Sequence, residues 1–179
     1  MSRRNKLARR KPSRLPRPDG VRFATPGDAA GGFLFDGRIA EDFKLATGTW
    51  VSVGPLRAAL VSALAPLAKD VVIAGHDRDD VAALIFPDLD ACRPLAGGDD
   101  LDDPKVREAF RKRLAAFAAK ASGSASRVER ILLLADPPSL DAGEITDKGS
   151  LNQRALLANR AADVEALYAD DTKPHVVRL

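Results

Sequence analysis

Two short segments of this chain hold the residues whose types and spacing could support chemistry. In residues 36–50, Arg38 follows a glycine, Lys44 comes six residues later, and Gly48 comes four residues after that. The second segment is Glu144-Ile-Thr-Asp-Lys-Gly-Ser-Leu-Asn-Gln-Arg154. A guanidinium supplies forked donors to oxygen acceptors, and a glycine lets a ligand approach the backbone closely. Because packing does not require this array, we expect two cations and a bare backbone to share one surface.

Together, the two segments resemble the C-terminal domain of adenylate-forming acyl-CoA synthetases, with the greatest likeness to feruloyl-CoA synthases. The resemblance covers about residues 20–168. In that family a carboxylate attacks ATP to give an acyl-adenylate, coenzyme A then displaces AMP, and the small domain rotates between the two steps. The resemblance therefore implies ATP and coenzyme A as co-substrates, Mg²⁺, and a small aromatic carboxylic acid as substrate. We expect none of these to bind to this chain alone.

The resemblance also implies roles for individual residues. Lys148 corresponds to the lysine that stabilises the α-phosphate and carboxylate oxygens during adenylation, which is electrostatic catalysis. Arg38 and Lys44 would contact the nucleotide. The family usually has glycine before this lysine, whereas this chain has the reversed order Lys148-Gly149.

Thr47, Gly48 and Trp50 would form the loop on the coenzyme A side, together with the neighbouring lysine. Ala40 and Glu41 mark the hinge, where the family commonly has aspartate or lysine in place of Ala40. Alanine lets the backbone rotate but offers no polar side-chain contact.

Simpler interpretations of three of these residues stay open. Arg38 could be a surface arginine paired with Asp36 or Glu41, and Trp50 could be a core or interface anchor. Lys148 could be a solvated lysine before a helix, next to an aspartate.

The sequence contains no phosphate loop of the Gly-x-x-x-x-Gly-Lys-Ser/Thr type, and the family's acyl pocket lies upstream of the matching domain. We therefore expect a detached C-terminal domain that complements a separate large adenylation domain and is inactive alone. The alternatives are a protein-docking module that uses residues 38–50, the remnant of a truncated gene, and nucleic-acid binding through the N-terminal tail.

The charge is distributed unevenly. Of the 28 basic residues, eight lie in residues 1–18, which contain no acid, so the rest of the chain carries 20 basic and 25 acidic residues. Residues 1–19 also contain three prolines and little apolar content, which predicts a disordered basic tail. Nucleic-acid binding and organelle targeting are possible uses of such a tail, but we favour a leader without a role, because the tail has no aromatic residue and the body no matching basic face.

Composition and cysteine usage predict a globular cytoplasmic protein. Apolar residues make up 45% and charged residues 30% of the chain, and no apolar run is long enough to span a bilayer. The single cysteine, Cys92, excludes an internal disulfide and is predicted to be a small packing or surface residue. No metal site is expected: His76 fits a polar turn, and the acidic run at residues 99–103 fits a helix start before Pro104.

Hydrophobic periodicity predicts an α+β fold, a small mixed sheet with β-hairpins flanked by about three helices. The resemblance implies that the domain spans residues 20–168, with a junction hairpin at 20–37 and the hinge at 38–42, and we expect a polar C-terminal tail at 169–179. The expected strands are a hairpin of residues 21–23 and 33–35, a strand at 50–53, a hairpin of 70–75 and 80–86, and a strand at 127–134.

Three helices are expected, each with one apolar face. The first follows Pro55 and has Leu56, Leu60, Leu64 and Leu67 on that face. The second spans 105–120, marked by Val106, Phe110, Leu114 and Phe117, and the third spans 150–168, with a stripe of Leu157, Ala161, Val164 and Tyr168.

Overall fold

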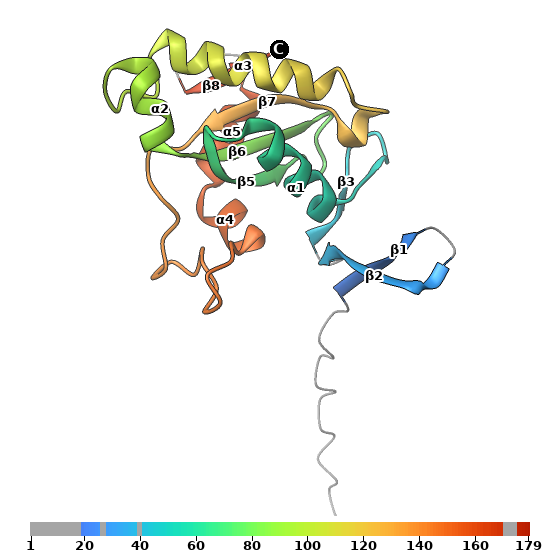
Figure 1. Cartoon of the computed structure of the whole chain (residues 1–179). Coiled ribbons are helices and arrows are strands. Elements are labelled where there is room, and N and C mark those ends of the chain that lie inside the picture. The colour runs from blue at the N-terminus through green and yellow to red at the C-terminus, as the bar shows by residue number, and fades with distance from the viewer. Residues whose placement is uncertain (1–18, 26–27, 39–40, 170–174) are drawn as a thin grey trace, which may run out of the picture.

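A mixed four-stranded sheet forms the centre of the computed structural model (Figure 1). The structure describes residues 19–25, 28–38, 41–169 and 175–179, and for residues 19–38 the backbone alone. The sheet order is β5-β6-β7-β8, with bounds of Ala68–Ala74 for β5, Val81–Pro87 for β6, Val128–Leu133 for β7 and Val176–Arg178 for β8. β6 pairs in parallel with β7, and the other two pairings are antiparallel. The predicted α+β class and mixed sheet are confirmed.

Helices cover both faces of this sheet (Figure 1). One face packs against α1 (Val53–Leu64), α2 (Leu89–Ala96) and α3 (Pro104–Ala118), and the other against α4 (Gln153–Asn159) and α5 (Ala161–Tyr168). Alternate residues of each strand point to opposite faces. In β6, Ala83 and Ile85 therefore join the first core, and Leu84 and Phe86 join the second. Every residue of β6 is buried, as expected for a central strand covered on both sides.

Two small hairpins precede the sheet. β1 (Asp19–Thr25) pairs antiparallel with β2 (Asp28–Arg38), and the register sets residue 21 opposite 35 and residue 23 opposite 33. β3 (Phe43–Lys44) pairs with β4 (Trp50–Val51). The first predicted hairpin and the hairpin of β5 and β6 are confirmed, whereas the strand predicted at residues 50–53 ends at Val51 because α1 begins at Val53.

Helix α1 confirms the predicted leucine stripe, with Leu56, Leu60 and Leu64 buried in the first core. The helix ends two residues before Pro66, because proline cannot donate the backbone hydrogen bond that would continue it. The fourth predicted leucine, Leu67, is therefore buried beyond the end of the helix. The Asp42 carboxylate accepts a hydrogen bond of 2.9 Å from the Val53 amide. That bond satisfies one of the unpaired donors at a helix start and attaches the last residue of the predicted hinge to α1.

Helix α3 begins where the acidic run ends. The Asp103 carboxylate accepts a hydrogen bond from the Lys105 amide, which is the predicted helix start. Val106, Phe110 and Leu114 are buried as predicted, but Ala118 holds the fourth buried position and Phe117 is half-buried beside it.

The helix predicted for residues 150–168 is wrong as a single element. It is interrupted at Arg160, whose backbone (φ −103°, ψ 33°) leaves the helical range between α4 and α5. The periodic stripe therefore does not continue across the break. Ala161 is exposed and Leu157, Val164 and Tyr168 are half-buried, while the buried positions are Leu156, Ala166 and Leu167.

Further elements were not predicted. α2 has Asp88 as its N-cap and Gly97 after its last turn, and it contains Pro94, a residue type that disfavours a helix interior. The buried Cys92 belongs to this helix and is a packing residue. A short 3-10 helix spans Ser124–Ser126. Part of the predicted polar C-terminal tail is β8, which pairs with β7 and buries two valines in the two cores. Among the described residues, no helix combines the length and hydropathy needed to cross a membrane.

The register of α3 can be tested by truncating its two phenylalanines. Phe110 is fully buried and Phe117 is half-buried, so Phe110→Ala should lower the free energy of unfolding by about 3–5 kcal/mol and Phe117→Ala by clearly less. Urea unfolding of the two variants and the wild type measures both values. Equal losses would contradict the observed register.

Candidate functional site

The pair of Lys44 and Trp50 is exposed at the end of the β3–β4 hairpin that adjoins its loop. The two residues are cross-strand partners, and the Lys44 ammonium lies 5.9 Å from the centre of the Trp50 ring. Trp50 is 50% exposed, so it is not a core anchor. A cation held beside an exposed aromatic face can contact a ligand that has both an anionic and an apolar part.

The turn of this hairpin explains Gly48. The Leu45 amide donates to the Thr49 carbonyl at 2.9 Å, and the Gly48 amide donates to the Leu45 carbonyl at 2.8 Å. This is a three-residue hairpin loop, in which the last loop residue adopts a left-handed conformation that favours glycine. Gly48 has φ +82°, and no atom lies within 4 Å of where a Cβ would stand. Thr47 is exposed at the second loop position and donates to the Thr49 hydroxyl at 3.1 Å.

A second turn supports this loop from the side. The Ala46 amide donates to the Arg78 carbonyl at 2.8 Å, and the Asp77 amide donates to the Lys44 carbonyl at 3.1 Å. Both partners lie in the β5–β6 turn, and the Arg78 guanidinium packs 4.9 Å from the centre of the Tyr168 ring. The β3–β4 loop is therefore fixed to the main sheet through backbone hydrogen bonds.

The predicted hinge is described in part. Arg38 is the last residue of β2, where it pairs with Asp19, and Ala40 lies outside the described residues. Glu41 is half-buried.

Lys148 lies in a hairpin with the same turn. The Thr146 amide donates to the Ser150 carbonyl at 2.8 Å, the Gly149 amide donates to the Thr146 carbonyl at 2.8 Å, and Gly149 has φ +78°. Lys148 is exposed at the second loop position, which is the position of Thr47 in the first hairpin. The order Lys-Gly follows from this geometry, because the left-handed position comes directly after the lysine.

Two buried polar side chains flank the Lys148 hairpin. Glu144, 3% exposed, precedes it and accepts two hydrogen bonds from the Arg160 guanidinium, at 3.1 Å and 3.0 Å. Gln153, 2% exposed, follows it; its amide donates to the Ile73 carbonyl at 2.9 Å and accepts from the Ile73 amide at 3.3 Å. Both ends of the hairpin are thus attached to the body of the domain.

The Arg160 guanidinium lowers the pKa of Glu144 below its ordinary value of 4.5, chiefly through their hydrogen bonds. A backbone hydrogen bond from Ser139 acts in the same direction, and burial opposes both. Glu144 is therefore ionised at neutral pH and forms a buried ion pair with Arg160.

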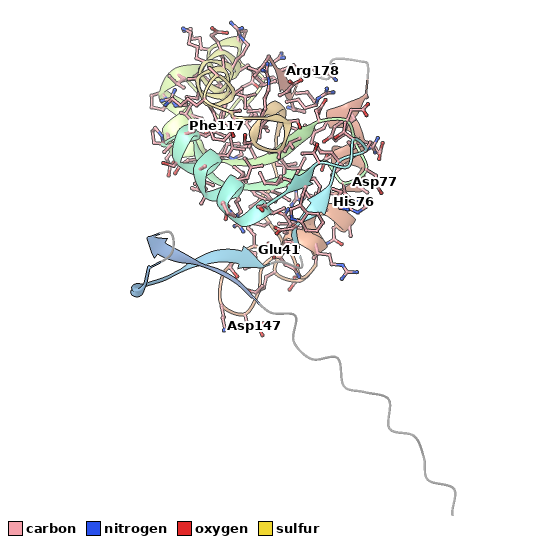
Figure 2. The ribbon with its side chains drawn as sticks, turned by 90° about the vertical axis from the view of Figure 1, so that its right-hand side faces the viewer. Glu41, His76, Asp77, Phe117, Asp147 and Arg178 are labelled. Atoms are coloured by element: carbon pink, nitrogen blue, oxygen red, sulfur yellow. The ribbon has the colours of Figure 1, made fainter. Side chains whose placement is uncertain are left out.

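The two hairpins lie on different sides of the domain. In Figure 1 the segment that carries Lys148, coloured orange, descends on the left of the sheet, whereas β3 lies on the right. Figure 2 shows Asp147 at the lower end of the body, away from His76 and Asp77, which belong to the turn that supports the β3–β4 loop. The structure therefore brings Lys44, Thr47, Gly48 and Trp50 together and keeps Lys148 apart from them.

Sequence reasoning did not find Arg160 or Gln153. Each acts through a partner far along the chain, 16 residues away for Arg160 and 80 for Gln153. In the part of the chain that the structure describes, no group of histidine, cysteine, aspartate or glutamate side chains could hold a metal ion.

Comparison with known proteins gives the family. The family described as AMP-binding enzyme C-terminal domain matches residues 42–172. A Mycobacterium tuberculosis protein named as a fatty-acid–CoA ligase, fadD11, is 31% identical over 127 residues, which cover 65% of this chain and 22% of that protein. The chain thus spans about a fifth of the length of this curated relative.

Solved structures with the same fold belong to carboxylate reductases. The adenylation domain of the Mycobacterium chelonae enzyme superposes with a TM-score of 0.65 at 24% identity, over 84% of this chain and 22% of that one. The adenylation and carrier didomain of the Segniliparus rugosus enzyme, solved with AMP, gives 0.63 at 23% identity, over 83% and 20%. At these identities the likeness shows the fold alone.

The ion pair between Glu144 and Arg160 predicts a pH dependence of stability. A carboxyl group whose pKa is lowered on folding stabilises the folded state fully above its unfolded pKa, and this contribution is lost as the pH falls through the lower folded pKa. Glu144→Gln should lower the free energy of unfolding by about 1–3 kcal/mol at pH 7, and by progressively less below the ordinary pKa of 4.5. Denaturant unfolding at several pH values measures this difference, and a constant difference would contradict the assignment.

Proposed function

This chain belongs to the family of AMP-binding enzyme C-terminal domains, and we propose that it is the C-terminal domain of an ATP-dependent acid–thiol ligase. In the first step the substrate carboxylate oxygen attacks the α-phosphorus of ATP, which gives an acyl-adenylate and releases pyrophosphate. In the second step the coenzyme A sulfur attacks the acyl carbonyl carbon and AMP leaves with its phosphate oxygen. The separation of the two exposed hairpins supports this proposal, because each can serve one step.

In the adenylation step Lys148 is the catalytic residue. Negative charge accumulates on the α-phosphate and on the attacking carboxylate, and an ammonium held beside these oxygens stabilises the transition state. The exposed position of Lys148 at the tip of a hairpin with an anchored base supports this role. The following glycine maintains the turn that presents the lysine.

In the thioester step Thr47, Gly48 and Trp50 line the approach of the pantetheine arm. The open space beside Gly48 leaves room for a thin chain along the backbone, and the half-exposed Trp50 ring offers an apolar surface beside it. Arg38 and Lys44 bind the nucleotide phosphates or ribose, for which guanidinium and ammonium groups are suited. Rotation at Ala40 and Glu41 exchanges the two faces.

A large adenylation domain is the required partner. That domain supplies the acyl pocket and the phosphate loop, and we propose that residues 20–168 form the unit that docks on it. By the family resemblance, Mg²⁺ enters with the phosphates of ATP. Turnover by this chain alone would be negligible because most substrate-positioning contacts lie on the partner.

The proposed substrate is a hydroxycinnamate such as ferulate. The segments at residues 35–55 and 144–154 together carry the likeness to feruloyl-CoA synthases. The curated relative is named for fatty acids, so a fatty acid is the informative competing substrate.

A protein-docking module without catalysis is the second candidate. One observation favours it: Trp50 is half-exposed beside a cation, and protein interfaces are enriched in tryptophan.

Product formation tests the proposal. Ferulate or palmitate would be incubated with ATP, Mg²⁺ and coenzyme A, with this chain alone and with the large domain of a feruloyl-CoA synthase, and acyl-CoA measured by chromatography. We expect feruloyl-CoA in the mixture only. Lys148→Ala should reduce it by about 100-fold, since loss of one electrostatic donor has this effect, whereas Lys112→Ala, an exposed lysine on α3, should not.

Formation of palmitoyl-CoA in place of feruloyl-CoA would contradict the proposed hydroxycinnamate substrate but would support the proposed ligase activity. Product from this chain alone would overturn the need for a partner. Absence of product from every combination, with wild-type folding intact, would favour the docking module.

A further inference from the structure

We propose that Arg160 and Gln153 are positioning residues for Lys148, which hold the hairpin of residues 145–151 in one orientation. This inference rests on the adenylation role proposed for Lys148. Neither side chain lies within the turn itself. Each instead connects one end of the hairpin to a different part of the domain.

Arg160 connects the segment before the hairpin to the helical layer. Besides its two bonds to Glu144, its guanidinium donates to the Pro137 carbonyl at 2.9 Å and to the Asp136 carbonyl at 3.3 Å. The same group packs 5.3 Å from the centre of the Phe86 ring in β6. One planar guanidinium thus fixes three points of the segment that leads from β7 to the hairpin.

Glu144 connects the segment held by Arg160 to the hairpin. Its second oxygen also accepts from the Ser139 amide at 2.8 Å, and its backbone carbonyl accepts from the Asn152 amide at 2.8 Å. The residue therefore closes the base of the hairpin with its backbone while its side chain is held by Arg160. Reorientation of the hairpin would break a buried ion pair.

Gln153 connects the other end to the sheet. β5 is an edge strand of the main sheet, and the Gln153 amide forms two hydrogen bonds with Ile73 in that strand. The side chain thus pairs with the strand edge as a neighbouring strand would. Leu151 adds an apolar attachment, since it pairs with Ile145 across the hairpin and is buried in the second core.

These attachments have a direct consequence for Lys148. The described part of the hairpin exposes residues 147–150 and buries or half-buries the residues that flank them. A catalytic ammonium must be placed within about 1 Å of its productive position to be effective. A long, flexible side chain meets this requirement better if its backbone is held from two sides.

The break between α4 and α5 supports the same view. Arg160 occupies the break, and the Asn159 amide beside it donates to the Ala142 carbonyl at 3.0 Å. Two consecutive side chains at the end of α4 therefore bind the segment before the hairpin. In a continuous helix, successive side chains point about 100° apart, so Asn159 and Arg160 would not both face this segment.

Hydrogen–deuterium exchange on the full chain tests the restraint itself. Arg160→Lys keeps the positive charge but removes the paired donors of the guanidinium. Gln153→Met keeps the size of the side chain but removes both hydrogen bonds to Ile73. In both variants the Thr146, Gly149 and Asn152 amides should exchange about tenfold faster, with β6 and β7 unchanged. The control variant is Arg111→Lys, which removes an exposed ion pair on α3 in which the guanidinium likewise donates two hydrogen bonds, to Glu108. It should leave the exchange rates of these amides unchanged.

The half-reactions, measured with the large domain of a feruloyl-CoA synthase, separate positioning from a purely structural role. Ferulate-dependent ATP–pyrophosphate exchange should fall about 10-fold to 100-fold in kcat for Arg160→Lys and Gln153→Met, with little change in KM for ATP. Thioester formation from supplied feruloyl-adenylate should stay at the wild-type rate. Faster amide exchange with unchanged adenylation, or equal losses in both half-reactions, would overturn the proposal. A wild-type mixture without any ATP–pyrophosphate exchange would instead overturn the proposed function.

Discussion

The buried ion pair between Glu144 and Arg160 is the interaction on which the placement of Lys148 depends. Removing two charges from water is unfavourable, and here every side-chain nitrogen and oxygen atom of the pair has a hydrogen-bond partner, which offsets that cost. Backbone groups of the segment between β7 and the hairpin supply these bonds. An arrangement of this segment that separated the two side chains would leave a buried charge unpaired. We therefore infer that the ion pair restricts the loop to one conformation.

A second constraint is shared by both exposed hairpins. Each has a three-residue loop that ends in a left-handed glycine, and each presents a side chain, Thr47 or Lys148, at the position before that glycine. The turn explains why lysine precedes glycine in this chain. The two hairpins lie on different sides of one sheet, which is the arrangement a domain needs if it offers two faces in turn.

The sequence predicted the elements whose signals are local. The leucine stripe of α1 and the acid-then-proline start of α3 lie within one or two helical turns, and both are confirmed. The break at Arg160 was missed because no proline or glycine marks it, and the partner that Arg160 contacts there, Glu144, lies 16 residues earlier. α2 was missed because Pro94 contradicts helical propensity. The candidate site residues were predicted from the residue types in two segments. The role of Gln153 could not be predicted in this way, because it depends on which strand forms the edge of the sheet.

The claim that the two hairpins serve different chemical steps is tested most directly by a pair of variants. Lys148→Ala and Trp50→Ala would each be assayed with a large adenylation domain for adenylate formation and, separately, for thioester formation from supplied feruloyl-adenylate. We expect Lys148→Ala to slow only the first half-reaction, by about 100-fold, and Trp50→Ala to slow only the second. If both variants slow both half-reactions equally, the division of labour between the hairpins is contradicted.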